Sequence, residues 1–119
     1  MSQRTERVQE AAREVLGTTI DSLKDPRVGF TTVTAVRVTP DLRHARVFVS
    51  VLGSESERSD TMAGLQSAVP YLRAELGRQI RLKYLPELIF ELDTGAEEAE
   101  RLETLLKKIH DEEGSGSEE

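Results

Sequence analysis

The chain has 119 residues, no cysteine and a formal net charge of −6, which is enough for one domain with a real core and excludes disulfides and thiolate metal sites. No run approaches eighteen consecutive apolar residues, and the N-terminal MSQRTERVQE carries no apolar signal region, so we expect a cytoplasmic protein without a membrane span. The negative charge is concentrated at the C-terminal end. The chain has 22 acidic and 16 basic residues, and residues 95–119 contain nine of the acidic and three of the basic ones. Residues 1–94 therefore contain thirteen of each and have no net charge. The acidic average is therefore compatible with a basic face on the body.

A helix and two strands are predicted first. Thr5 to about Leu23 reads as an amphipathic helix, with an apolar stripe at Val8, Ala11, Ala12, Val15, Leu16, Thr19 and Leu23. Asp25–Gly29 is a turn, because proline restricts the residue before it and glycine supplies turn backbone. Phe30–Thr39 is rich in β-branched residues and predicts a strand. Ala45–Leu52 alternates strictly and predicts a second strand, with one buried face formed by Ala45, Val47, Val49 and Val51.

A kinked helix pair is predicted next. Residues 53–60 are polar and read as a loop. The apolar residues after them fall three or four apart, as on one helical stripe, at Met62, Leu65, Val69, Leu72, Leu76 and Ile80. Pro70 interrupts this stripe, and a helix interior does not accept proline without a break. We therefore predict two short helices joined by a kink at Ala68-Val69-Pro70.

One flank of the second short helix is basic or small. At about 100° per residue, one arc that contains no acid holds Arg73, Gly77, Arg81, Ala74 and Arg78. These arginines, followed by Lys83, suit contacts with phosphates. The alternative is a solvated helix flank whose long side chains have buried stems.

A third strand and a last helix complete the predicted fold. Pro86–Leu92 reads as a strand with Leu88, Phe90 and Leu92 facing inward. Gly95 to about Asp111 reads as a helix, and residues 112–119 (EEGSGSEE) as a flexible acidic tail. The prediction is one α+β domain over residues 1–111, with helices packed on one face of a three-stranded sheet. The other face would show Arg37, His44, Arg46 and Phe48 unless the last helix covers it.

Catalytic and metal sites are poorly supported. Asp93-Thr94-Gly95 resembles the active-site turn of aspartic proteases, in which two carboxyl groups from two halves share a proton. Here the motif leads into a helix, and a capping box of Thr94 with Glu97 explains it. His44 and His110 show no metal-ligand spacing. We predict no enzyme, no metal and no cofactor.

Several motifs in a fixed order resemble one family. Their residues are Leu23-Lys24-Asp25-Pro26-Arg27-Val28-Gly29, Thr31-Thr32-Val33-Thr34 with Val36 and Val38, Asp41-Leu42, Ala45-Arg46-Val47-Phe48-Val49-Ser50-Val51-Leu52-Gly53, Leu72-Arg73 with Leu76, Leu82-Lys83, and Leu85-Pro86-Glu87-Leu88 with Phe90 and Asp93. Over about Arg4–Ile109 the chain resembles the bacterial ribosome-binding factor A family. The Asp-Pro-Arg turn and the Pro-Glu-Leu strand start are specific together, in that order and at that separation.

The resemblance implies a type II KH-like fold, in the order helix, strand, strand, helix, kink, helix, strand. It implies a factor without chemistry of its own that binds the free 30S subunit and contacts 16S rRNA. It also implies that the factor assists maturation of the rRNA 5′ end and supports growth in the cold. The family replaces the GXXG turn of KH domains with a kink carrying Ala-x-Gly. Ala68 matches this pattern, but Pro70 stands where the glycine would be and fixes φ near about −65°.

The candidate RNA-binding residues follow from both arguments. They are Arg73, Arg78, Arg81 and Lys83 on and after the second short helix, Arg43 and Arg46 on the sheet, and Arg4 and Arg7 at the first helix start. The kink residues Ala68, Val69 and Pro70 lie where KH domains hold RNA. We expect a monomer whose partners are the 30S subunit and its 16S rRNA. The alternative is a protein-interaction module that binds a partner through the open sheet face, with Phe48 and Ile89 as contacts.

Overall fold

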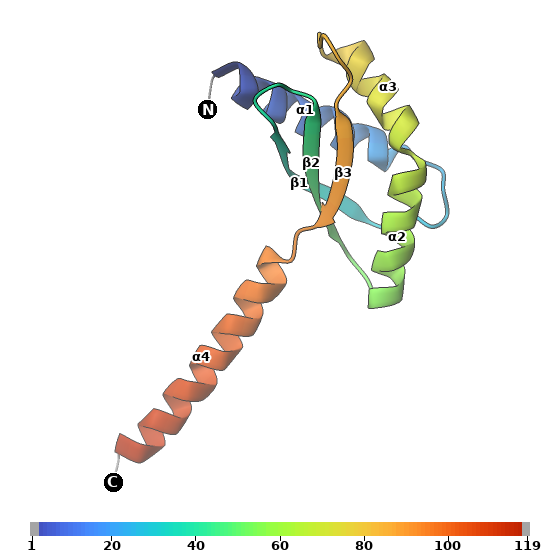
Figure 1. The fold of residues 1–119 in the computed structure, drawn as a ribbon. Coiled ribbons are helices and arrows are strands. Elements are labelled where there is room, and N and C mark those ends of the chain that lie inside the picture. The colour runs from blue at the N-terminus through green and yellow to red at the C-terminus, as the bar shows by residue number, and fades with distance from the viewer. Residues whose placement is uncertain (1–2, 118–119) are drawn as a thin grey trace.

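The computed structural model describes the backbone of residues 3–117 and the side chains of residues 3–95 and 100–111 (Figure 1). Its elements, in chain order, are α1 (Gln3–Asp21), β1 (Thr31–Val38), β2 (His44–Val51), α2 (Glu55–Ser67), α3 (Val69–Gln79), β3 (Glu87–Leu92) and α4 (Gly95–Ser117). β1 pairs antiparallel with β2, and β2 pairs parallel with β3, so the sheet order is β1-β2-β3. This confirms the predicted α+β order with an added C-terminal helix.

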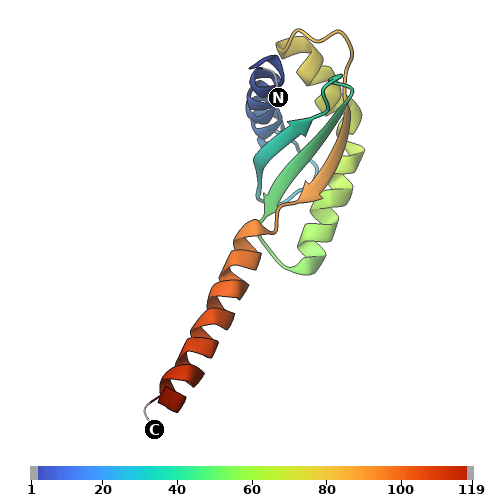
Figure 2. The same cartoon turned by 60° about the vertical axis from the view of Figure 1, so that its left-hand side comes forward.

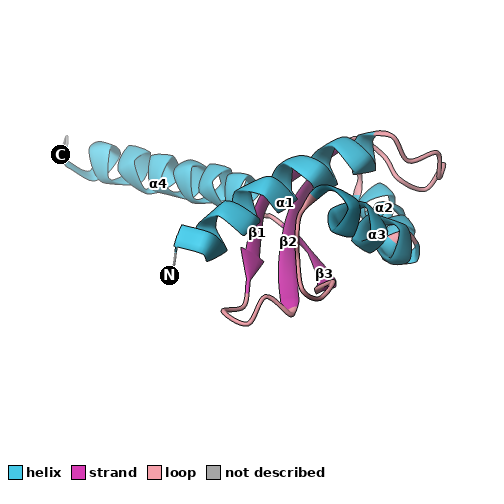
Figure 3. Ribbon diagram, turned by 90° about the horizontal axis from the view of Figure 1, so that it is seen from above, coloured by secondary structure: helices cyan, strands magenta, loops and turns pink. Residues whose placement is uncertain are grey.

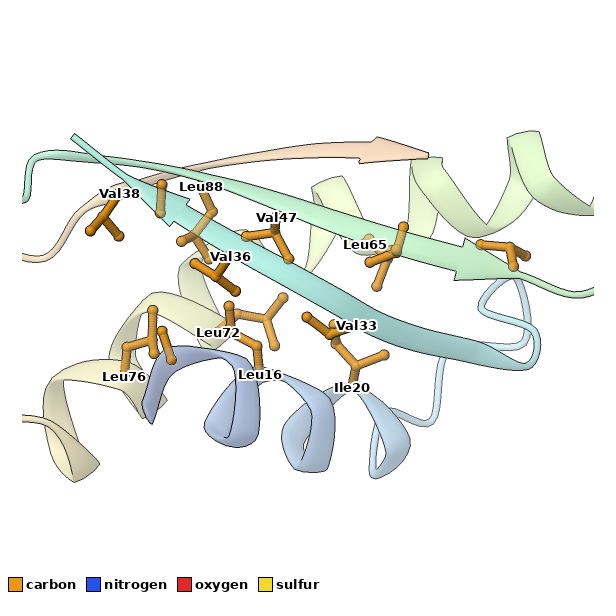
Figure 4. Packing of buried hydrophobic residues seen from close by; sticks show 14 residues of the cluster. Leu16, Ile20, Val33, Val36, Val38, Val47, Leu65, Leu72, Leu76 and Leu88 are labelled. Carbon is orange, nitrogen blue, oxygen red and sulfur yellow. The ribbon is translucent and has the colours of Figure 1, made fainter. Parts of the chain in front are cut away.

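The core lies between the sheet and the helices on one of its faces (Figures 3 and 4). Leu16 of α1 meets residues of the inner sheet face and of α2 and α3 there. Four inner residues of β2 are buried, as their alternation predicts: Ala45, Val47, Val49 and Val51. Leu92 was predicted to face inward but is 37% exposed, because β3 is an edge strand and the chain leaves the sheet directly after it.

The first turn of α2 was wrongly predicted as part of a loop. α2 begins at Glu55, within residues 53–60. Ser54 and Glu57 form a capping box: the Glu57 N–H donates to Ser54 Oγ (3.1 Å) and the Ser54 N–H donates to Glu57 Oε1 (3.1 Å). This turn is polar because it faces solvent, so hydrophobic periodicity does not detect it, whereas the capping box does.

The break between α2 and α3 lies at Ala68, as predicted. Ala68 is both the C-cap of α2 and the N-cap of α3, with φ −85° and ψ −4°. Its carbonyl accepts from the Leu72 N–H at 2.9 Å and so begins the second helix. Pro70 lies in the first turn of α3, where backbone N–H groups lack helical partners, so its missing N–H costs little there.

α2 also holds the turn that precedes β1. Thr61 is fully buried, and its hydroxyl oxygen accepts from the Gly29 N–H at 3.0 Å and donates to the Arg27 carbonyl at 3.3 Å. A Cβ on Gly64 would lie 2.6 Å from Val28 Cγ2, so the turn packs directly on the helix backbone. The Asp-Pro-Arg motif is therefore part of a tight helix–turn contact.

α4 extends away from the sheet and leaves its second face uncovered (Figure 1). The helix continues to Ser117, past the end near Asp111 that was predicted because residues 112–119 are acidic and flexible in composition. Its apolar side chains Leu102, Leu105, Leu106 and Ile109 are all exposed. The division into one domain and a flexible acidic tail over residues 112–119 stays a prediction.

Candidate nucleic-acid interface

Basic residues from three separate segments gather at one end of the molecule. The start of α1, the end of α3 with the loop after it, and the β1–β2 turn all lie at the end opposite α4 (Figure 2). We call this region the basic end and define it by Arg4, Arg7, Arg43, Arg81 and Lys83. All five were predicted as RNA contacts, and the fold brings them to one region although they span most of the body sequence.

A groove of about 490 Å³ crosses the basic end between α1 and the end of α3. Its apolar floor is Val8, Ala11 and Ile80, and its charged rim is Arg4, Arg7 and Arg81. No hydrogen bond or ion pair joins the three rim side chains to another described residue. Exposed guanidinium groups around an apolar floor suit an anion that also carries flat or apolar parts, because phosphate pairs with arginine in two-point geometry.

Tyr84 lies in the α3–β3 loop, three residues after the groove residue Arg81, and sequence reasoning missed it. The guanidinium carbon of Arg43 lies 4.5 Å from the centroid of the Tyr84 ring, and Lys83 Nζ lies 5.5 Å from it. The ring is therefore the point at which the cations of two distant segments meet. The available signal was an aromatic residue next to lysine in a loop, a pattern too common to single out.

Arg73 holds the α3–β3 loop. Its Nε donates to the Pro86 carbonyl and its Nη2 donates to the Leu85 carbonyl, both at 2.9 Å. One turn later, a Cβ on Gly77 would lie 2.6 Å from Leu85 Cδ2. The predicted arc on α3 is thus largely the surface on which this loop rests. Arg81, predicted on the same arc, instead follows the end of α3 at Gln79 and lines the groove.

Two other predicted arginines lie outside the basic end. Arg78 forms an ion pair with Glu75 at 2.7 Å on the surface of α3. Arg46 lies on the open sheet face, where Nε and Nη2 donate to the two carboxylate oxygens of Glu91 at 2.5 and 3.0 Å. Hydrogen bonding to Arg46 lowers the pKa of the Glu91 carboxyl. Arg46 also lies over the ring of Phe48, 5.1 Å from its centroid.

The kink residues do not line the groove. Ala68 and Val69 are half-buried, and Pro70 is exposed at the junction of α2 and α3. The fold therefore separates the kink, where KH domains hold RNA, from the groove rim.

Asp93 acts as a clamp at the start of α4. The Thr34 hydroxyl donates to its Oδ2 at 2.7 Å, and the Gly95 N–H donates to its Oδ1 at 2.9 Å. These two hydrogen bonds, the first the stronger, hold the pKa of the Asp93 carboxyl below its usual range. Both oxygens of the Asp93 carboxyl thus accept hydrogen bonds within the protein, from the Thr34 side chain and from the Gly95 backbone, which assigns this residue a structural role. The Glu97 side chain of the expected capping box lies outside the described side chains.

Within the described residues, no group of three or more histidine, aspartate or glutamate side chains is placed to hold a metal ion. No helix among those residues is long and apolar enough to cross a membrane.

The helix order, the break at Ala68 and the three-stranded sheet covered on one face define the class as a type II KH-like α+β domain. The family model described as Ribosome-binding factor A matches residues 4–106. The chain belongs to the ribosome-binding factor A family.

Relatives and solved structures agree with this assignment. A ribosome-binding factor A from Desulforamulus reducens is 43% identical over 120 residues, which span the whole of both chains. The crystal structure of ribosome-binding factor A from Thermus thermophilus superposes with a TM-score of 0.67 at 30% identity, over 74% of this chain and 94% of that chain. Coordinates of the Thermus thermophilus factor fitted into the cryo-EM map of a 30S complex give a TM-score of 0.63 at 27% identity, over 80% of this chain and 97% of that chain.

Proposed function

We propose that this protein is a non-enzymatic assembly factor that binds the free 30S subunit and contacts 16S rRNA through its basic end. The observation that carries the proposal is the groove between α1 and α3, where Arg4, Arg7 and Arg81 meet without protein partners among the described residues. Unpaired arginines at one site suit a polyanion, because each phosphate contact also releases a counterion. The relative fitted into a 30S complex supports the same partner.

The finer biological role follows the family resemblance. We propose that the factor acts as a cytoplasmic monomer late in 30S maturation, assists processing of the 16S rRNA 5′ end and supports growth in the cold. Arg43 and Lys83 extend the phosphate contacts of the groove along the basic end. Arg73 contributes by holding the loop, and its third nitrogen, Nη1, has no partner among the described residues. Arg46, Arg78 and the kink residues Ala68, Val69 and Pro70 form a second, outer set of contacts.

Two substitutions in the groove test the proposal. Arg7→Ala with Arg81→Ala is expected to weaken binding to purified 30S subunits and to flatten its log–log salt dependence by about 1.5 units, since each phosphate contact contributes about 0.7–0.9. The measurement is co-sedimentation across a salt series. Arg101→Ala, an exposed arginine on α4, is the matched control and should leave affinity and slope unchanged at about 0.15 M salt and above, where the charge of α4 is screened. Unchanged affinity and slope in the double variant would exclude the groove as the RNA contact.

A protein-interaction module is the second candidate function. The observation that favours it is the uncovered sheet face, on which Ile89 is 46% exposed. The bidentate Arg46–Glu91 pair occupies the same face, which makes it more polar than a typical protein-binding surface. This candidate predicts a complex that survives high salt and is lost in Ile89→Asp. Binding that is lost at moderate salt and unaffected by Ile89→Asp would count against it.

A further inference from the structure

Tyr84 presents an aromatic ring at the basic end. Its side chain lies in the α3–β3 loop and the residue is 48% exposed. Arg43 lies over the ring with its guanidinium carbon 4.5 Å from the centroid, and Lys83 Nζ lies at 5.5 Å. A flat ring with open surface, bordered by two cations, combines the two features with which proteins hold unpaired nucleotides.

The segments that carry the ring are anchored on both sides. On the α3 side, Arg73 donates to the carbonyls of Leu85 and Pro86, the residues directly after Tyr84. On the sheet side, the Glu87 N–H donates to the Arg43 carbonyl at 2.8 Å and ties the loop to the β1–β2 turn. The ring is therefore held in place before any ligand arrives, which lowers the entropy cost of binding.

We propose that Tyr84 is a stacking platform for one nucleobase of single-stranded RNA, with Arg43 close over the ring and the more distant Lys83 ammonium group turning to the neighbouring phosphate. The proposal rests on the proposed function and deepens it, because it adds a defined contact to a base to the phosphate contacts of the basic end. Base stacking on an aromatic ring tolerates any sequence, since every base has a π face. The platform therefore selects unpaired RNA over duplex RNA, whose bases are already stacked.

A structural role for the ring makes a different prediction. If the Arg43–Tyr84 contact only ties the turn to the loop, removing the ring changes stability but not the dependence of binding on bases. The comparison that separates the two roles uses a labelled decauridylate and a decamer of the same length with abasic sugars, which carries the same phosphates. Fluorescence anisotropy gives the affinity for each.

The expected result is that the wild-type protein binds decauridylate about tenfold more tightly than the abasic decamer. Tyr84→Phe keeps this ratio because the ring remains. Tyr84→Leu reduces the ratio to about one and leaves the salt dependence unchanged, because no phosphate contact is lost. Arg7→Ala with Arg81→Ala weakens both decamers equally.

A second test keeps the Tyr84 ring and measures its fluorescence. The chain has two tyrosines and no tryptophan, so Tyr71→Phe leaves Tyr84 as the single fluorophore of the full chain. Decauridylate should quench its emission, and the abasic decamer should not.

Either of two results overturns the proposal: wild-type protein that binds the two decamers equally or binds neither, or Tyr84→Leu that keeps the wild-type ratio. Co-sedimentation with 30S subunits tests the proposed function separately. If the protein sediments with 30S subunits but binds the two decamers equally, the proposed function stands and the stacking platform is excluded.

Discussion

Arg73 illustrates how a single residue can be found from sequence while its surroundings cannot. Helical spacing places Arg73, Gly77 and Arg81 on one arc, and the structure has the first two on α3 beside the loop. Arg81 was wrongly placed on that arc, because α3 ends at Gln79 and the backbone is extended at Ile80. That the Leu85 and Pro86 carbonyls reach Arg73 depends on the path of a loop twelve residues further along, which no local pattern encodes. Tyr84 was missed for the same reason, because its partner Arg43 comes from a different turn.

Removal of the Arg73 guanidinium should destabilise the protein. Arg73→Met keeps the apolar stem and loses two hydrogen bonds to carbonyl groups of the α3–β3 loop, so we expect the free energy of unfolding to fall by about 1–2 kcal/mol. Urea denaturation measures the change. Arg78→Met on the same helix is the control, and it should cost little because Arg78 forms only an exposed ion pair with Glu75. Equal costs for the two variants would show that the loop is held mainly by other contacts.

At the scale of elements, periodicity located every helix and strand but not every boundary. Alternation gave the buried face of β2 correctly, because packing on one face imposes a strict period of two. Alternation could not predict the β-bulge between Val33 and Ala35. At this bulge the Thr34 hydroxyl donates a hydrogen bond to Asp93, which directly follows β3. The polar first turn of α2 was not predicted as helix, because the sequence signal for it is a capping box and not a hydrophobic pattern.

The break between α2 and α3 can be tested by replacing Pro70. Pro70→Gly should lower the melting temperature, because glycine widens the unfolded ensemble by an amount worth about 0.4–1 kcal/mol and adds no contact in the first turn of α3. Pro70→Ala separates chain entropy from helix propensity and should fall between wild type and the glycine variant. Thermal unfolding followed by circular dichroism gives the three melting temperatures. A glycine variant as stable as wild type would show that the proline is strained at the kink.

In the whole molecule, the basic and the acidic regions are separated along the long axis. The molecule extends over 67 × 38 × 17 Å, with the basic end and α4 at opposite ends (Figure 2). Residues 95–119 carry the entire net charge of −6, since the rest of the chain holds equal numbers of acids and bases. This arrangement orients the basic end toward a polyanion and keeps the acidic segment away from it.

Truncation after Gly95 tests whether α4 acts only through its charge. The body should keep its stability, because the apolar side chains of α4 among the described residues are exposed and do not contribute to the core. Repulsion between the acidic segment and RNA decays over a Debye length, about 30 Å at 0.01 M salt and about 8 Å at 0.15 M. Removal of the segment should therefore tighten 30S binding at low salt and change it by less than about twofold at 0.15 M.

The exposed stripe on α4 supplies the matched control for that experiment. Leu102→Gln with Leu106→Gln removes apolar surface from the full chain without changing its charge, so 30S affinity should equal that of wild type at both salt concentrations. If truncation instead weakens binding at both salt concentrations and the double glutamine variant weakens it equally, α4 contacts the subunit through its apolar face. Charge would then explain only the orientation of approach, and the long helix would be a second binding element on the opposite end from the groove.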